Sequence, residues 1–429
     1  MVRTNKLLAA CIFLLAGKFA NAQPGTPPIL ADTLQVTLDS AENMFLRNNF
    51  QLLAQHYNID AAKAQVIQAG LFPNPNVSVT TAVYNTQTKG LFPFGKNGEI
   101  TGQVNQLIYL AGKRNKQISI AKAGTKLAEY QFYDLVRTLK YTLRTDYFNI
   151  YYLQASAKLY NQEIASLQQV VNAFNEQEGK GYISEKEVVR IKAQLYSLQS
   201  EYNDLVNQIN DAESELRVVL QTPKVYIYPQ VNTAAADAQN PLAYPLATLV
   251  DSAYKDRTDL AIAKQNTEIS KLNYTYQKSL ATPDITLSAG YDQQGSYINN
   301  YNFIGASIDL PFFNRNQGNI KAAKANIDIN NALQKSTEAG VEEQVYRSLQ
   351  KAVDNDKLYR QIDPAFSGNF ERLMHEVLLN YQKRNITLLD FLDFYDSYKQ
   401  NILQQNQIKF NRISALEDIN YYTGTNFFN

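Results

Sequence analysis

Residues 113–178 read KRNKQISIAKAGTKLAEYQFYDLVRTLKYTLRTDYFNIYYLQASAKLYNQEIASLQQVVNAFNEQE, a stretch of 66 residues with no proline and a single glycine, Gly124. As one helix it would be about 99 Å long at about 1.5 Å per residue, whereas the mean helix has only about 11 to 12 residues. Its apolar residues alternate at steps of three and four from Ile150 to Phe174, which is the spacing of a coiled-coil seam. The stretch therefore predicts one very long helix with a partner helix along its side.

The partner follows directly in the chain. After a break at Gly179-Lys180-Gly181, the same three-and-four spacing resumes at Val188 and continues to Val219. Two seams joined by a short glycine turn predict a long antiparallel helical hairpin. The hairpin ends near Gln221, and the proline-rich stretch after it reads as a linker or small irregular subdomain.

Composition excludes several functional classes. The chain has 429 residues and a formal net charge of +1, and phosphate binding would need a basic excess, so we expect no nucleic-acid partner. The only two histidines, His56 and His375, each stand alone on a predicted helix, without the clustered partners of a metal or general-base site. Gly112-Lys113-Arg114 lacks the upstream glycine of a phosphate-binding loop. The sequence thus predicts no enzyme, no cofactor and no metal site.

Residues 1–22 have the pattern of a secretory signal. A positively charged start is followed by an apolar run to Gly17 and by the small residues Ala20-Asn21-Ala22, so we expect the mature chain to begin near Gln23 and to be exported. The segment Leu8-Ala9-Ala10-Cys11 also resembles a lipoprotein box. In that alternative, Cys11 would be retained and acylated instead of being removed with the signal.

Four short segments alternate in polarity like strands. They are residues 77–83, 99–110, 284–292 and 302–310. In the third segment Ile285, Leu287, Ala289 and Tyr291 share one face, and in the fourth Ile304, Ala306, Ile308 and Leu310 do. One apolar and one polar face over about ten residues is the signature of a transmembrane barrel strand, although half-buried strands of a soluble sheet have the same pattern.

The chain is an internal duplication. Leu260 through Pro283 match Leu52 through Pro75 at an offset of 208, and each half reads helix, strand, strand, long helix, turn, helix. We therefore divide the chain into a signal peptide at 1–22, a first repeat at 23–221, a linker or equatorial segment at 222–246 and a second repeat at 247–429. Within the first repeat, 23–35 is expected to be an extended leader and 38–68 a helix.

Four strands are too few to close a barrel, and an open strand edge in lipid leaves backbone groups unpaired at several kcal/mol each. The protomer must then associate if the strands lie in a membrane. Two copies give eight strands with a filled interior, whereas three give twelve and a lumen wide enough for water. We favour the trimer.

Three junctions between strands and helices carry a family resemblance. The segments Leu310-Pro311-Phe312-Phe313-Asn314-Arg315-Asn316-Gln317-Gly318, Leu71-Phe72-Pro73-Asn74-Pro75 and Leu110-Ala111-Gly112-Lys113-Arg114 resemble the conserved joints of the TolC family of outer-membrane efflux proteins, most of all its heavy-metal and cation branch. Proline and glycine suit such bends because a regular strand ladder must end there. The joint residues of this sequence are Pro75, Gly112, Pro283, Pro311 and Gly318.

The resemblance implies a mostly helical fold with a transmembrane β-barrel. Three protomers would form a 12-stranded β-barrel on an α-barrel of long antiparallel coiled-coil helices, in the outer membrane of a Gram-negative bacterium. It also implies the function of an exit duct in a tripartite efflux pump, with a periplasmic adaptor and an inner-membrane transporter of the RND type as partners. The alternatives are an exit duct of type I protein secretion and a non-channel periplasmic adaptor or coiled-coil scaffold.

By the same resemblance, Thr387 to Asp393 is the aperture segment at the periplasmic mouth. Asp390 and Asp393 match two aspartates that form acidic rings there, and three copies would gather six carboxylates that attract cations. Tyr381 matches a tyrosine that latches the closed mouth. The latch arginine falls at Ile386, so Arg384 is its candidate substitute. Alternatively, the acids only complement the helix dipole.

Overall fold

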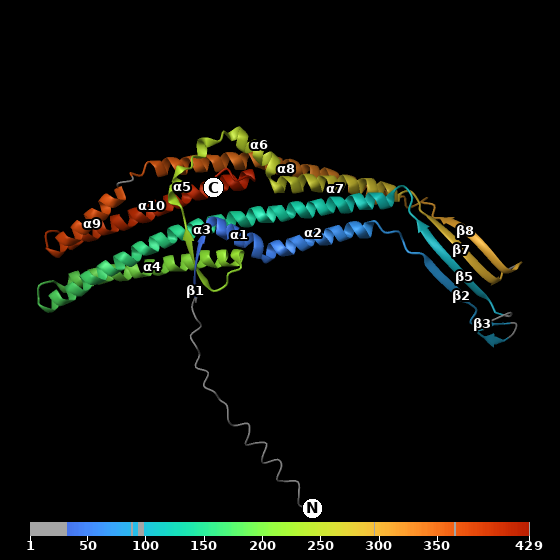
Figure 1. The fold of residues 1–429 in the computed structure, drawn as a ribbon, viewed down its shortest axis with the longest axis horizontal. Helices are drawn as coiled ribbons and strands as arrows, with labels where there is room; N and C mark the ends of the chain where they lie inside the picture. Colours follow the sequence, from blue (N-terminus) through green and yellow to red (C-terminus); the bar gives the residue numbers. More distant parts are fainter. Residues whose placement is uncertain (1–31, 87–88, 93–97, 296, 364–365, 429) are drawn as a thin grey trace, which may run out of the picture.

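The computed structural model describes residues 32–428 except 87–88, 93–97, 296 and 364–365. The expected signal segment 1–22, with Cys11, lies outside the described residues. The sheet formed by β2, β5, β7 and β8 occupies one end of an elongated molecule, and the turns α3–α4 and α9–α10 occupy the other end (Figure 1). The C-terminal part of α10 lies near the middle of the length.

Along the chain, groups of consecutive helices are separated by single strands or groups of strands. The strands are β1 (Asp32–Thr37), β2 (Asn76–Thr81), β3 (Tyr84–Asn85), β4 (Gly90–Leu91), β5 (Ile100–Ile108), β6 (Val225–Gln230), β7 (Ile285–Gln294) and β8 (Asn299–Ile308). The helices are α1 (Leu38–Asn48), α2 (Phe50–Ala69), α3 (Lys113–Gly179), α4 (Glu185–Leu220), α5 (Thr233–Ala238), the 3-10 helix η1 (Pro241–Ala243), α6 (Leu246–Asp256), α7 (Thr258–Leu280), α8 (Gln317–Arg360), α9 (Phe366–Gln382) and α10 (Leu388–Thr423).

The long helix and its partner are confirmed. Helix α3 has 67 residues and ends at the predicted glycine turn, where Gly181 has a left-handed backbone with φ of +77°. Helix α4 begins with a capping box, in which Ser184 and Glu187 bond each other's backbone groups. Along the distal half of α3, which runs to the turn, the predicted seam residues of both helices are buried together: examples are Leu167, Phe174, Ile191 and Leu198.

Two helices that were expected to be continuous are interrupted. The helix predicted at 38–68 is divided at Asn49, whose side chain accepts bonds from Gln51 N and Leu52 N and donates one to Val219 O at 2.9 Å. The second long helix is likewise in two parts, α8 and α9, and the sequence between them contains Pro364, which lacks the N–H that a helix interior needs.

The middle of the molecule holds a small sheet that the sequence did not predict. Residues expected to be an extended leader form β1, which pairs in parallel with β6 from the expected linker. Val36 and Ile227, one from each strand, are buried, and the Tyr147 hydroxyl of α3 donates to Val36 O at 3.1 Å and to Gln230 O at 2.7 Å. These contacts fix the equatorial segment on α3.

Helix α3 changes partners along its length. Its distal half packs with α4, α9 and α10 around one core, while its proximal half, towards the sheet, lies between α2 and α7 (Figure 1). The order helix, strand, strand, helix occurs twice, as α2–β2–β5–α3 and as α7–β7–β8–α8, ignoring the short β3 and β4. The exact limits of the two repeats stay a prediction. In the part of the chain that is described, none of the helices has the length and apolarity to cross a membrane.

Candidate functional site

The four-stranded sheet has one apolar and one polar face. Strands pair in the order β2–β5–β7–β8, all antiparallel, and residues directly opposite each other share a face. The register places these residues together on the apolar face: Val77, Val79, Val104, Ile108, Ile285, Leu287, Ala289, Tyr291, Ile304, Ala306 and Ile308. Gln106, near the helices, is a polar interruption of this face. The face assignments made from the sequence for β7 and β8 agree with this register.

Among the described residues, no element covers the apolar face. Ile304 is 91% exposed, Val79 71% and Val77 67%. A contiguous exposed apolar surface of this kind marks a contact with lipid or with another chain. The opposite face carries hydroxyl and amide side chains: Ser78, Thr80, Gln103, Asn105, Thr286, Ser288 and Ser307. The sheet can therefore separate an apolar from an aqueous phase.

Both edges of this sheet are open in the protomer. Strand β2 pairs only with β5, and β8 pairs only with β7, among the residues that the structure describes. Each edge presents a row of backbone N–H and C=O groups that can pair with another chain. Since β2 and β8 run in opposite directions, β8 of one copy can continue the antiparallel pattern with β2 of the next.

The joint before α3 is held by an ion pair across the two halves of the chain. Gly112 caps α3 with a left-handed backbone, φ +67°, which directs the chain from strand into helix. The next residue, Lys113, is buried, and its Nζ lies 2.7 Å from Asp284 Oδ1 and donates to Thr282 O. Asp284 also accepts a bond from Leu110 N. The first and second strand pairs are thus joined to the same helix start.

The other predicted joint residues lie at or beside strand ends. Pro75 directly precedes β2, Pro283 lies just before β7, and Pro311 follows β8. Gly318 is the second residue of α8. At that joint the left-handed residue is Asn316, with φ +57°, and its amide donates to Gln277 O of α7. The roles of the five joint residues remain predictions.

The four predicted aperture residues lie at the end of the molecule away from the sheet. Asp390 belongs to a capping box at the start of α10, where its carboxylate accepts bonds from Thr387 N at 3.2 Å and Thr387 Oγ1 at 2.7 Å. These hydrogen bonds lower the pKa of Asp390. Asp393, one turn later, is exposed. The Asp390 carboxylate is thus engaged in hydrogen bonds at the start of its own helix, which agrees with the alternative that these acids only serve the helix start. Asp393 is directed to solvent.

The two latch candidates bind in different ways. Arg384, with φ +60°, donates from Nη2 to Tyr182 O at 2.6 Å and to Gln177 Oε1 at 3.3 Å, so it joins the α9–α10 turn to the α3–α4 turn. Tyr381 is buried and its ring stacks on Phe391 with centroids 4.6 Å apart. Its hydroxyl has no hydrogen-bond partner among the described residues, and burial raises its pKa. Of the two latch candidates, Arg384 therefore makes a polar contact between the two turns, and Tyr381 makes none with the described residues.

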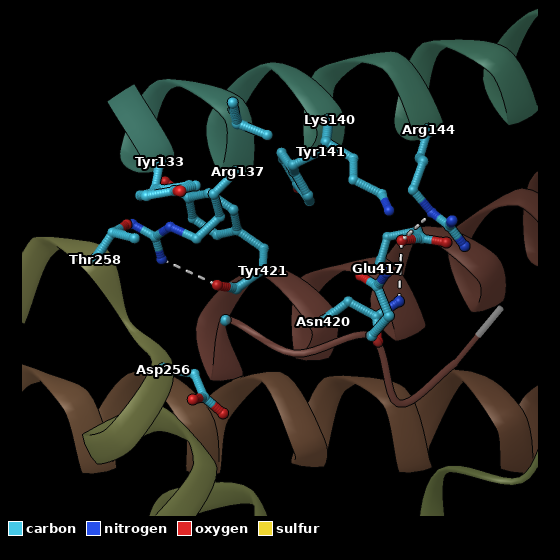
Figure 2. Close-up of a pocket in the computed structure, with 13 residues that line it drawn as sticks. Tyr133, Arg137, Lys140, Tyr141, Arg144, Asp256, Thr258, Glu417, Asn420 and Tyr421 are labelled. Carbon is cyan, nitrogen blue, oxygen red and sulfur yellow. Dashed lines mark hydrogen bonds and ion pairs between the residues drawn. The ribbon is translucent and has the colours of Figure 1, made fainter. Parts of the chain in front are cut away.

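A network of charges surrounds a pocket of about 380 Å³ at mid-length (Figure 2). Arg137, Lys140 and Arg144 extend from α3, and Arg144 lies 2.7 Å from both Glu417 and Glu42. Burial alone lowers the pKa of Arg144, but the two carboxylates raise it overall. Every one of these cations has a carboxylate partner: Asp134 for Arg137, Glu42 for Lys140, and Glu42 and Glu417 for Arg144. These ion pairs therefore join α1, α3 and α10 to one another.

The histidines remain apart from any such cluster. His56 lies 3.6 Å from Asp60 on the exposed side of α2, and His375 lies on α9 beside a groove with Met374 and Tyr395. No group of three or more metal-ligating side chains occurs in the described part of the chain.

Sequence reasoning missed the ion pairs that join elements far apart in the chain. Lys113 with Asp284, and Arg144 with Glu42 and Glu417, are far apart in sequence, and a single sequence has no local signal for such pairs. A weak signal existed at Asp284, because a charged residue between Pro283 and an apolar strand needs a partner when it is buried.

Comparisons with known proteins agree with this architecture. The model of the family described as outer membrane efflux protein matches residues 43–221. The cobalt-zinc-cadmium resistance protein CzcC of Cupriavidus metallidurans is 21% identical over 322 residues, which are 74% of this chain and 74% of that protein. The crystal structure of the CmeC outer membrane channel of Campylobacter jejuni has a TM-score of 0.74 at 17% identity and covers 91% of this chain and 86% of that one. A crystal structure of CusC has a TM-score of 0.72 at 14% identity, with 92% and 93% covered.

Proposed function

Starting from a chain that belongs to the TolC family of outer membrane efflux proteins, we propose that it is the exit duct of a tripartite efflux pump. The duct is passive: it conducts solutes from the periplasm to the exterior, and an inner-membrane transporter supplies the energy. Its location is the outer membrane, with the helices in the periplasm.

The observation that carries this proposal is the sheet with one exposed apolar face, one polar face and two open edges. Three copies joined edge to edge would make a 12-stranded barrel, with the apolar face towards lipid and the polar face around water. Helix α3, about 100 Å long at 1.5 Å per residue, would extend this lumen far into the periplasm. A homotrimer follows from the proposal, because a single four-stranded sheet cannot close.

Partners and substrate follow from the resemblance to the heavy-metal branch. The resistance protein CzcC is named for cobalt, zinc and cadmium, and we extend divalent metal cations to this chain as its substrate class. The partners are then a periplasmic adaptor and an inner-membrane pump of the RND type. The acidic residues Asp390 and Asp393 at the far turns would favour cations at the entrance.

Deletion of the gene tests the proposal. Cells without it should accumulate more cobalt, zinc or cadmium than the parent at the same external concentration, and the intact gene supplied on a plasmid should restore the parent level. As a matched control, a variant with Ala306→Arg in β8 should fail to restore it while Ser307→Arg restores it. Unchanged metal content together with loss of a secreted protein would overturn efflux in favour of a secretion duct.

A further inference from the structure

Two aromatic residues, Tyr301 and Phe303, occupy the polar face of β8. The register pairs Phe303 directly with Gly290 of β7, on the face that carries Ser288 and Ser307. Apart from these two residues, the polar-face positions of the two strands hold small or hydrophilic side chains. A phenyl ring on this face would project into the lumen if it stood upright.

The ring does not stand upright. A methyl group added at Gly290 would lie 2.5 Å from Phe303 Cζ and 2.7 Å from Cε1, so the tip of the ring occupies the space above the glycine. Within strand β8, all of which is described, Phe303 is the one residue that is not exposed. Tyr301 stacks on it from the same face, with centroids 5.9 Å apart and planes 20° apart. The ring therefore lies across β7 against the sheet.

The glycine is what makes this arrangement possible. Any side chain at position 290 would take the volume that the ring now fills, and its Cβ would also approach Gly102 O at 2.8 Å. Glycine in a strand interior weakens the strand and often marks a close approach of another group. An aromatic ring that covers such a glycine recovers apolar contact. We call the space above Gly290 that a side chain would fill the seat, and the ring of Phe303 occupies it.

We infer that the seat of Phe303 on Gly290 sets the bore of the strand segment of the channel. With the ring against the wall, three copies leave the lumen open to hydrated cations. If the ring is displaced, three phenyl groups at one level narrow the lumen and present apolar surface to the solute. This inference rests on the proposed function, because it needs the polar face to line the lumen of a trimer.

Unit conductance in planar bilayers tests the seat, because single-channel records count only assembled channels. Gly290→Ala should lower the unit conductance roughly two-fold by displacing the ring. Phe303→Ala should leave it close to the wild-type value, since the ring already lies against the wall. The double variant Gly290→Ala with Phe303→Ala should recover the wild-type value.

Two control variants separate the seat from general effects. Gly102→Ala, whose new methyl group would meet nothing within 4 Å, should leave the conductance unchanged. Ser307→Phe places a ring opposite Thr286 instead of a glycine, so that ring has no seat and should lower the conductance. A Phe303→Ala channel that conducts much more than wild type would show an upright ring and overturn the inference.

A new methyl group at position 290 would also lie 2.8 Å from Gly102 O, so Gly290→Ala could prevent folding for a reason other than the ring. If Gly290→Ala gives no channels and the double variant restores them, Phe303 was the obstacle and the seat is supported. If the double variant also gives none, the Phe303→Ala and Ser307→Phe channels decide: equal conductance in both would overturn the seat. Absence of conductance from the wild-type protein itself would contradict the proposed function and not the seat alone.

Discussion

Asp390 and Asp393 are one helical turn apart at the start of α10, but different contacts surround their carboxylates. Thr387 bonds the Asp390 carboxylate through its backbone N–H and its hydroxyl, and these bonds lower the pKa of Asp390. Asp393 lies beyond the cap and is exposed. In an acidic ring at the periplasmic mouth, the carboxylate directed to solvent would therefore be that of Asp393. The Asp390 carboxylate would add negative charge, but it is already hydrogen-bonded to Thr387.

The proposed aperture predicts a graded effect on ion selectivity. Asp390→Ala with Asp393→Ala should weaken cation selectivity and block by trivalent cations in planar bilayers, since six carboxylates would be lost from a narrow ring. Asp393→Asn alone should give a large share of that effect. Asp390→Asn is the matched control for the cap, because an amide oxygen still accepts from Thr387 while the charge is removed.

Unchanged selectivity in the double variant would leave both residues as helix-start acids. Loss of the Asp390 side chain should then be visible only as a lower unfolding temperature, because the capping box at the start of α10 is lost.

A third titratable residue, Asp146, lies within the helical part of the molecule. Asp146 of α3 has a buried carboxylate oxygen, Oδ2, with no hydrogen-bond partner among the described residues. Burial raises its pKa to about 7, and the charge of Glu215 on α4 adds to the effect. The folded chain therefore binds a proton here more tightly than the unfolded chain, whose aspartate has a pKa of about 3.9.

This difference in the pKa of Asp146 determines how the free energy of unfolding changes with pH. Where the folded state binds more protons, the free energy of unfolding falls as pH rises, here between about pH 4 and pH 7. Asp146→Asn should remove this loss and raise the free energy of unfolding at pH 8 by about 1 kcal/mol or more, since one pKa unit is about 1.4 kcal/mol. The unfolding temperature at pH 8 should rise with it.

Thermal unfolding of the purified variant at pH 5 and pH 8 measures the effect of Asp146→Asn. The gain should be largest at pH 8. Glu215→Gln is the matched variant, and its gain should be smaller because burial is the larger cause of the shift. A gain that is equal at both pH values would contradict a protonated Asp146.

The side chains of β8 alternate between the apolar and the polar face of the sheet. Ala306 lies opposite Leu287 on the apolar face, and Ser307 lies opposite Thr286 on the polar face. Adjacent residues of one strand should thus respond oppositely to the same charge. Because the two residues are adjacent, a difference between them reports the direction of the side chain and not its position along the strand.

Ala306→Arg should reduce the amount of assembled protein in the membrane, because a cation at mid-bilayer on the lipid face costs about 2 to 4 kcal/mol. Ser307→Arg should assemble normally and change the conductance instead. Quantification of the trimer in outer-membrane fractions and single-channel recording measure the two effects. Equal assembly of both variants would mean that the faces are not lipid and lumen.

Elements with a regular period were predictable, whereas elements defined by distant partners were not. The seam of α3 and α4 and the alternation in β7 and β8 could be read directly from sequence, because burial there repeats every 3.5 or every two residues. The pairing of β1 with β6 could not, because six-residue strands carry little period and the partner is almost 200 residues away. The break at Asn49 was missed for a similar reason: its amide bonds Val219 O of a helix far along the chain.

The same distinction holds for the candidate site. The positions of Asp390, Asp393 and the joint prolines came from local motifs, and the structure places them at helix starts and strand ends. The contact of Arg384 with Tyr182 depends on two turns that only the folded hairpins bring together. The flat position of Phe303 depends on a glycine in the neighbouring strand, which a register reveals and a sequence alone does not.

The open edges of β2 and β8 determine how copies of the whole molecule can assemble. Residues opposite each other in antiparallel strands share a face, so Ser78 on the polar face of β2 must meet a polar-face residue of β8 from the next copy. Candidates on that face include Phe303, Gly305 and Ser307. The sequence contains one cysteine, Cys11, so introduced cysteine pairs can be read with little background once Cys11 is replaced by serine.

A cysteine at position 78 combined with one at 303, 305 or 307 should form disulfides between copies at one of these registers, since opposite Cβ atoms approach to about 4.5 to 5.5 Å. Oxidised membranes should then show covalent dimers and trimers on a reducing-agent-free gel, and no larger species, because a ring of three has no free edge. Each single cysteine should give none. A ladder that stops at the dimer would indicate an eight-stranded closure, and one that continues beyond three would indicate an open ribbon; either result would contradict the trimeric duct.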